Sequence, residues 1–307
     1  MCSDRRIVDL WAEFEAMPER QLFDRLLTFQ YSLSIFEGNY RELRNILLWQ
    51  ATSPDAKELW YLPNRQLLHT FMEEVTRLLH NFAAAAKSLV DHTTRHHRHL
   101  YEGSDRFPEY RQEVRTRFAA NPLAKFVMGL RTYCQHYQIP PVVSVLSPSG
   151  EGSDYCSKVL LDTGKLREFS GWSAPAKQFL NSAGETVDLL AAIEEYHATV
   201  VDFYRWFQGR QRDIHAPELK RLAEKRREIE SLDISETLRA VLAAYPDGPW
   251  DPDDYFRHIL SPAQWQEVTS YPRNSAERCD KLIAFIEARA QISDDLKSQI
   301  RRLYRVG

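Results

Sequence analysis

The chain has 307 residues, of which 43% are hydrophobic and 27% charged, and its formal net charge is −3. This composition excludes an intrinsically disordered chain, and the charge excludes a global positive field that would draw the whole molecule to nucleic acid or acidic membranes. Four scattered cysteines without a Cys-x-x-Cys pair argue against a structural zinc site and a disulfide framework. No apolar run is long enough to cross a bilayer, so we expect a cytoplasmic protein.

The N-terminal part predicts amphipathic helices. Residues 5–50 carry a dense apolar load at mostly helical spacing, which predicts three helices. Gly38 is expected to end the second of them, and the third is expected over 40–50. Residues 55–62 are expected to form a short connector.

The next stretch predicts one unusually long helix. From Asn64 to about Tyr101, apolar residues recur at steps of three and four. A shorter helix is expected over 107–119. Asn121 and Pro122 then supply a cap and a first-turn proline for the helix that follows.

After residue 141 the pattern changes to that of a small sheet. Residues 142–146 and 155–161 predict strands joined by a Ser/Gly-rich loop over 147–154. A turn at 162–164 leads to a third expected strand over 165–169.

The remaining chain returns to helical patterns. Helices are expected over 173–181 and 185–212, and residues 216–231 form a mixed-charge helix typical of a solvated face or linker. From residue 234, prolines punctuate a series of short helices.

These elements define a mainly α fold, a multi-helix bundle with long helices. We expect a helical body over 1–232 that carries a β insertion at about 142–170. A small all-α C-terminal domain is expected over 233–307.

One predicted helix, within 121–141, carries residues able to perform chemistry. Its polar side is bracketed by Arg131 and His136, with Thr132 and Gln135 between them. At 100° per residue, Arg131 and His136 lie about 140° apart on a straight helix. They can meet at one phosphate if the arginine swings over, if the helix end unwinds, or if a second subunit completes the site.

Such a pair is suited to RNA cleavage. An arginine holds a phosphate oxygen through charge-assisted hydrogen bonds. A histidine titrates near neutral pH and can pass protons between the ribose 2′-hydroxyl, water and the leaving oxygen. This chemistry needs no metal and no cofactor, and we expect neither.

The segment from Arg131 to His136 resembles the Arg-x4-His motif of the HEPN superfamily, over at most residues 64–210. These are compact helical proteins that include many RNA-cutting toxins and defence nucleases of bacteria, and they usually act as dimers. The resemblance implies Arg131 as phosphate clamp and His136 as general acid and base. Family members commonly have Asn, Asp or His after the arginine, whereas this chain has Thr132, which cannot carry charge.

A second candidate group ends the long helix. Arg95, His96, Arg98 and His99 are expected to bind RNA as a local basic wall beside the Arg131 site. Two other interpretations of this segment stay open. His92, His96 and His99 share one stripe that could face a metal, or the segment is simply a polar helix end favoured by the helix dipole.

Two further motifs have alternative interpretations. Asp162, Thr163 and Gly164 match the aspartic-protease triplet, but between two expected strands they are typical of a turn. Glu194 and His197 match half of a di-iron carboxylate motif, but no second Glu-x-x-His accompanies them, which favours a surface helix.

The leading hypothesis is therefore a HEPN-like, metal-independent endoribonuclease, a hydrolase of bacterial stress or phage defence that acts on RNA as a homodimer. The alternative is a non-catalytic helical adaptor or RNA-binding protein with a degenerate motif. In that case the C-terminal helical domain would bind a protein partner.

Overall fold

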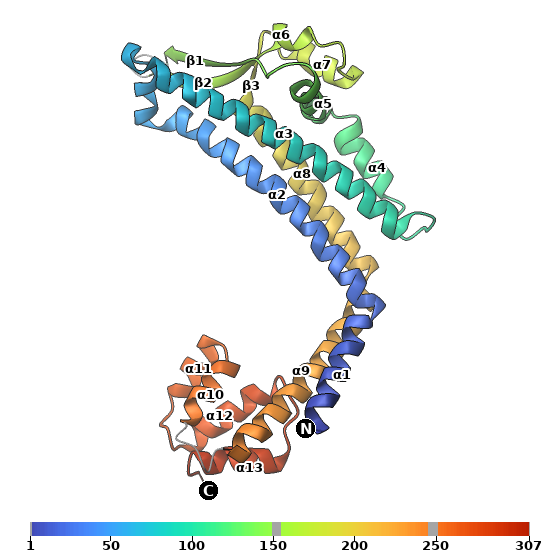
Figure 1. The fold of residues 1–307 in the computed structure, drawn as a ribbon, viewed down its shortest axis with the longest axis vertical. Coiled ribbons are helices and arrows are strands. Elements are labelled where there is room, and N and C mark those ends of the chain that lie inside the picture. Colours follow the sequence, from blue (N-terminus) through green and yellow to red (C-terminus); the bar gives the residue numbers. More distant parts are fainter. Residues whose placement is uncertain (1, 149–154, 245–250, 307) are drawn as a thin grey trace. The chain divides into compact units, whose positions relative to one another are not determined.

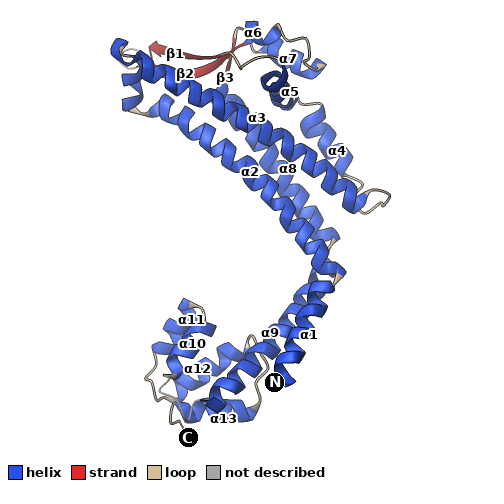
Figure 2. Ribbon diagram, in the orientation of Figure 1, coloured by secondary structure: helices blue, strands red, loops and turns tan. Residues whose placement is uncertain are grey.

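The computed structural model describes residues 2–148, 155–244 and 251–306. They form a mainly α-helical protein with one small antiparallel sheet, which confirms the predicted fold class (Figure 2). The chain divides into two compact units, residues 24–215 and residues 1–23 with 216–307. This unit boundary at 215/216 lies before the domain boundary expected at 232/233. Each unit is described below by itself.

Long helices form the framework of the 24–215 unit. Helices α2 (Pro18–Thr52), α3 (Arg65–Tyr101) and α8 (Leu189–Ile214) run alongside one another there (Figure 1). Their apolar faces meet in one core, with side chains such as Phe36, Leu79 and Phe207 fully buried. The single helix expected from Asn64 to Tyr101 is confirmed, because its apolar period continues for the whole length of α3.

The break expected at Gly38 is wrong. Helix α2 continues through this glycine, and Phe36 and Leu43 on either side of it are buried in the same core. A glycine inside a helix costs about 1 kcal/mol relative to alanine, which burial of these flanking side chains outweighs. Residues 5–50 therefore belong to α1 (Cys2–Ala16) and α2, rather than to three helices.

Short elements connect the long ones. The expected connector consists of two 3₁₀ helices, η1 (Pro54–Trp60) and η2 (Leu62–Asn64). After α3, the helix expected over 107–119 forms as α4 (Tyr110–Val114), followed by a π-helical turn, η3 (Arg115–Ala119). Helix α5 (Pro122–His136) comes next.

The sheet has the order β1-β2-β3. The strands predicted over 142–146 and 155–161 form as β1 (Val142–Pro148) and β2 (Tyr155–Asp162). They pair antiparallel, with Val142 opposite Leu161. In the loop expected over 147–154, residues 149–154 lie outside the described residues.

The third strand is not where the sequence placed it. Residues 165–169 do not form a strand, because Asp162 caps a helix, α6 (Thr163–Arg167), by accepting a hydrogen bond from the Lys165 backbone N–H at 3.1 Å. The third strand is β3 (Thr186–Asp188), which pairs with β2 and so delays the start of α8 from Glu185 to Leu189. Helix α7 (Ala174–Ser182) forms as expected.

The other unit contains a helical pair and a C-terminal core. Helix α9 (Ala216–Ala244) packs on α1 through Phe14, Leu222 and Ile229. Its predicted charged face is partly used here, because Arg221 pairs with Glu19 at 2.8 Å.

Short helices complete this unit, namely α10 (Pro252–Ile259), α11 (Pro262–Thr269), α12 (Ala276–Glu287) and α13 (Asp294–Leu303). Together with the end of α9 they bury a separate core that includes Leu238, Phe256, Leu282 and Tyr304. In the parts of the chain that the structure describes, no helix combines the length and the apolar character needed to span a membrane.

Candidate functional site

Helix α5, which carries the Arg-x4-His motif, has well-defined ends. The Asn121 side chain accepts a hydrogen bond from the Ala124 backbone N–H at 3.1 Å, which confirms the predicted cap. The helix continues to His136, and the Tyr137 backbone N–H donates to the Tyr133 carbonyl at 3.0 Å. The motif therefore lies entirely within a regular helix.

The opposite face of α5 is held by aromatic packing. Phe126 and Tyr133 stack on Trp172, with ring centroids 5.4 and 5.9 Å apart. The indole N–H of Trp172 donates to the Leu166 carbonyl at 2.6 Å, which fixes the ring. Gly129 lies so close that a Cβ there would be 2.6 Å from the indole. These contacts set the rotation of α5 about its axis, and so the direction of its polar face.

That polar face is open to solvent. Thr132, Gln135 and His136 are exposed and Arg131 is half-buried. Among the described residues, none of these four side chains makes a hydrogen bond or an ion pair. Because α5 is helical as far as His136, Arg131 and His136 keep their separation of about 140° around its axis. Within one chain, the unwinding that would bring them together does not occur.

The basic wall expected at the end of α3 is divided. His96 turns inward, with its ring stacked on Phe29 of α2 at a centroid distance of 4.5 Å. Its Nε2 accepts a hydrogen bond from the Gln211 side chain at 2.8 Å, and burial lowers the pKa of His96 to about 4. The imidazole is therefore neutral at pH 7 and adds no positive charge.

His96 belongs to a buried polar network that joins α3 to α8. The Gln211 amide also donates to the Tyr101 hydroxyl at 3.2 Å, and that hydroxyl lies 3.0 Å from Nε2 of His215. Gln211, Tyr101 and His215 are all buried. Hydrogen bonds compensate the burial of these polar groups, so the network stabilises this end of the bundle.

The other cations of the α3 end face two different pockets. Arg95 and His99 line a groove of about 470 Å³ against α2. Arg98 lines a pocket of about 630 Å³ between the end of α3 and the start of α4, and it lies 3.8 Å from Glu102. The linings of these two pockets contain neither Arg131 nor His136. Figure 1 likewise shows α5 near the middle of α3 and the last turns of α3 beyond it.

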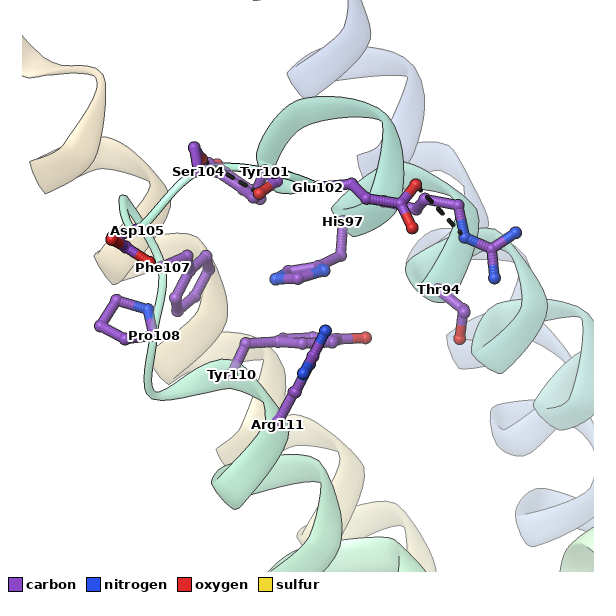
Figure 3. A pocket seen from close by; sticks show the side chains of 12 residues that line it. Thr94, His97, Tyr101, Glu102, Ser104, Asp105, Phe107, Pro108, Tyr110 and Arg111 are labelled. Atoms are coloured by element: carbon purple, nitrogen blue, oxygen red, sulfur yellow. Dashed lines mark hydrogen bonds and ion pairs between the residues drawn. The ribbon is translucent and has the colours of Figure 1, made fainter.

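The larger pocket contains a histidine with unusual surroundings (Figure 3). The His97 ring lies over that of Tyr110, with centroids 3.6 Å apart, and Phe107 lies beside it. Burial, together with the positive charge of Arg111, lowers the pKa of His97 to about 4. A neutral imidazole can accept or donate a hydrogen bond here, but it cannot attract a phosphate by charge.

Contacts also settle the motifs with alternative interpretations. Asp162 is a helix cap beside an antiparallel sheet, which is a structural role. Glu194 pairs with Arg44 at 2.7 Å, and His197 with Glu37 at 2.9 Å, so both tie α8 to α2. No group of three His, Cys, Asp or Glu side chains among the described residues is arranged to hold a metal ion.

Sequence reasoning did not identify the residues that complete the two pockets. Tyr110 and Arg111 of α4 line the same pocket as His97, and Arg25 and Phe29 of α2 line the same groove as Arg95 and His96. The α2 residues are far from α3 in sequence, and their helical period indicates only a buried face and an exposed one. No local signal shows which exposed arginines will line the same groove.

Comparison with known proteins provides no further assignment. No protein-family model, no curated protein and no solved structure matches this chain.

Proposed function

We propose that this chain is a HEPN-like, metal-independent endoribonuclease that acts as a homodimer. The observation that carries the proposal is the state of Arg131, Thr132, Gln135 and His136, which lie on a solvent-facing side of α5 without intramolecular partners among the described residues. Folding does not use these side chains, so they remain available to a substrate.

The separation of the two key residues dictates how a site would be built. Arg131 and His136 diverge by about 140° on one regular helix, so a single copy does not bring them to one phosphate. Two copies related by a two-fold axis can place Arg131 of one chain beside the partner's His136. Each dimer then has two equivalent composite sites.

The chemistry follows from the residue types. The guanidinium of Arg131 binds the non-bridging oxygens of the scissile phosphate. The imidazole of His136 accepts the proton of the 2′-hydroxyl, whose oxygen attacks phosphorus as the bond from phosphorus to the 5′-oxygen breaks. The leaving 5′-oxygen takes a proton from water, and the imidazolium returns its proton to the resulting hydroxide. Thr132 and Gln135 donate hydrogen bonds to the phosphate or ribose. The products are a 2′,3′-cyclic phosphate and a free 5′-hydroxyl.

The first test is cleavage of single-stranded RNA by purified protein in EDTA. Because general acid–base catalysis contributes about 10²–10⁴-fold, His136→Ala is expected to lower the rate by at least about 100-fold, and Arg131→Ala comparably. His69→Gln and Arg41→Gln, at exposed helical positions, are the matched controls and should cleave like wild type. Equal cleavage by wild type, His136→Ala and Arg131→Ala would refute the assignment.

Mixing the two inactive variants tests the composite site. Random exchange makes half of the dimers mixed, and each mixed dimer has one intact site of two, so about a quarter of wild-type activity should return. If both residues of a site came from one copy, every site in the mixed dimer would lack one residue and no activity would return.

The alternative function is RNA binding or protein binding without cleavage. The divergence of Arg131 and His136 on one helix favours it, because each could then contact a separate phosphate. In that case wild type binds RNA but does not cleave it, and Arg131→Ala weakens binding. We further propose a cytoplasmic role in bacterial stress or phage defence, with the C-terminal helices binding a protein partner.

A further inference from the structure

The groove between α2 and α3 has features that the Arg131 motif does not explain. It has a volume of about 470 Å³, within the range of pockets that hold small ligands. Its lining includes the stacked pair Phe29 and His96, which we call the floor because Phe29 is buried. The exposed Arg25 of α2 and Arg95 of α3 also line it, and we call them its sides.

The floor is rigid and uncharged. Phe29 is buried, and its ring is fixed between His96 at 4.5 Å and Phe207 at 5.6 Å. The hydrogen bond from Gln211 occupies Nε2 of His96. Because Phe29 is buried, it backs the half-buried His96 ring, and a ring held in this way offers contact area to an apolar or planar group with little loss of side-chain entropy.

The sides of the groove are positively charged. Arg25 and Arg95 are exposed, and neither forms an ion pair with any residue that the structure describes. The lining also includes one carboxylate, Asp24, which has an interaction of its own. The arginines therefore have unused charge, and planar guanidinium groups are well suited to bind phosphate oxygens.

Hydrogen-bonding groups complete the lining. The Ser32 hydroxyl lies 2.9 Å from Nδ1 of His92, which orients that ring and leaves its Nε2 for a ligand. Thr28 and His99 add a hydroxyl and a second imidazole. A charged rim over an aromatic floor is the arrangement with which proteins bind single-stranded nucleic acid.

We propose that this groove binds an unpaired RNA nucleotide, with its phosphate between Arg25 and Arg95 and its sugar and base over the Phe29–His96 floor. The identity of the ligand as RNA rests on the proposed function. The groove revises the expected RNA-binding set. Arg95 and His99 remain in this set, and Arg25 and His92 join it. His96 contributes only as a neutral part of the floor. Arg98 leaves the set because it lines the other pocket.

The test is binding of a fluorescent 2′-O-methyl RNA of about ten nucleotides, which spans a typical single-strand site. This RNA has no free 2′-hydroxyl to attack the phosphate, so it is bound without being cleaved. Arg25→Gln with Arg95→Gln is expected to weaken binding at least about tenfold, because two charge-assisted contacts are lost. The slope of log K against log salt concentration should also become shallower by about 0.7, since the two arginines bind one phosphate and each phosphate neutralised on a single strand contributes about 0.7.

The matched control is Arg41→Gln with Arg65→Gln, which removes the same charge from exposed positions on the same two helices. It should change affinity less than about twofold, because screened distant charges contribute little. Circular dichroism melting shows whether each variant is folded. An equal loss of affinity in both double variants, or no loss in either, would refute the proposal that this groove binds RNA.

The outcomes separate this proposal from the nuclease proposal. Weakened binding by Arg25→Gln/Arg95→Gln, together with unchanged cleavage by His136→Ala, would support the groove and refute the catalytic assignment. Loss of cleavage in His136→Ala, together with unchanged binding by Arg25→Gln/Arg95→Gln, would support the catalytic assignment and refute the groove proposal. If wild type binds no RNA, both proposals fall.

Discussion

At the scale of single residues, the environment of a histidine decides its role more than its position in a motif does. His96, His97 and His99 are close together in sequence, yet His96 packs on Phe29, His97 stacks on Tyr110 and His99 lines an open groove. The sequence shows which helical stripe each ring occupies. It does not show that Gln211 will fix His96 as a neutral acceptor.

The half-buried His96 makes stability depend on pH. Its pKa is lowered from 6.5 to about 4 by burial, so between these values the unfolded chain binds a proton that the folded chain does not. Stability is therefore fully present above pH 6.5 and is lost as the pH falls towards 4, by about 2 kcal/mol for a partly exposed side chain. His97 contributes in the same direction.

Urea unfolding between about pH 5 and pH 7.5 measures this dependence. His96→Gln keeps an acceptor for Gln211 but does not titrate, so its stability should fall less on acidification than that of wild type. His69→Gln, at an exposed position, is the control. If both variants kept the full dependence of wild type, His96 would not be its source.

At the scale of secondary-structure elements, packing overrides local signals where the two conflict. Gly38 was expected to end a helix and does not, because the residues around it are buried in one continuous core. Asp162 was expected in a turn before a strand, and instead it caps α6. In contrast, the cap at Asn121 was predictable because its hydrogen bond to the Ala124 N–H is local.

Two glycines in helices provide a matched test of packing. At Gly38 a Cβ would have no atom within 4 Å, so Gly38→Ala should stabilise the protein by about 0.5–1 kcal/mol through helix propensity. At Gly129 a Cβ would lie 2.6 Å from the Trp172 ring, which cannot move without losing its hydrogen bond to Leu166. Gly129→Ala should therefore destabilise by about 1–3 kcal/mol.

Thermal or urea unfolding of the two variants shows the sign of each effect. Stabilisation by both substitutions would mean that Trp172 yields to the new methyl group and that the rotation of α5 is not fixed by this contact. Since the polar face of α5 depends on that rotation, Gly129→Ala should also reduce any activity that requires Arg131 and His136.

At the scale of the whole molecule, the hydrophobic cores are separate. Residues 24–215 share the large core, whereas the C-terminal helices bury their own, around residues such as Leu282 and Tyr304. In the C-terminal core, Arg278 pairs with Asp253 at 2.7 Å, and Asp253 accepts a hydrogen bond from the Tyr304 hydroxyl at 2.6 Å. Each core has its own set of stabilising contacts.

Separate cores predict separable unfolding. Leu130→Ala, in the large core, and Leu282→Ala, in the C-terminal core, should each cost about 2–5 kcal/mol. Differential scanning calorimetry should show two transitions, with each substitution lowering only one of them. A single transition shifted by both variants would show that the cores unfold cooperatively.

The sequence by itself determined the helical class, the length of α3, the paired strands β1 and β2, and the buried face of α5. These features depend on periodicity and capping, which are properties of neighbouring residues. Only the tertiary structure decided that α2 continues through Gly38, that β3 comes from residues 186–188, and that Arg25 and Arg95 line the same groove. These features arise from contacts between residues distant in sequence, which helical periodicity does not determine.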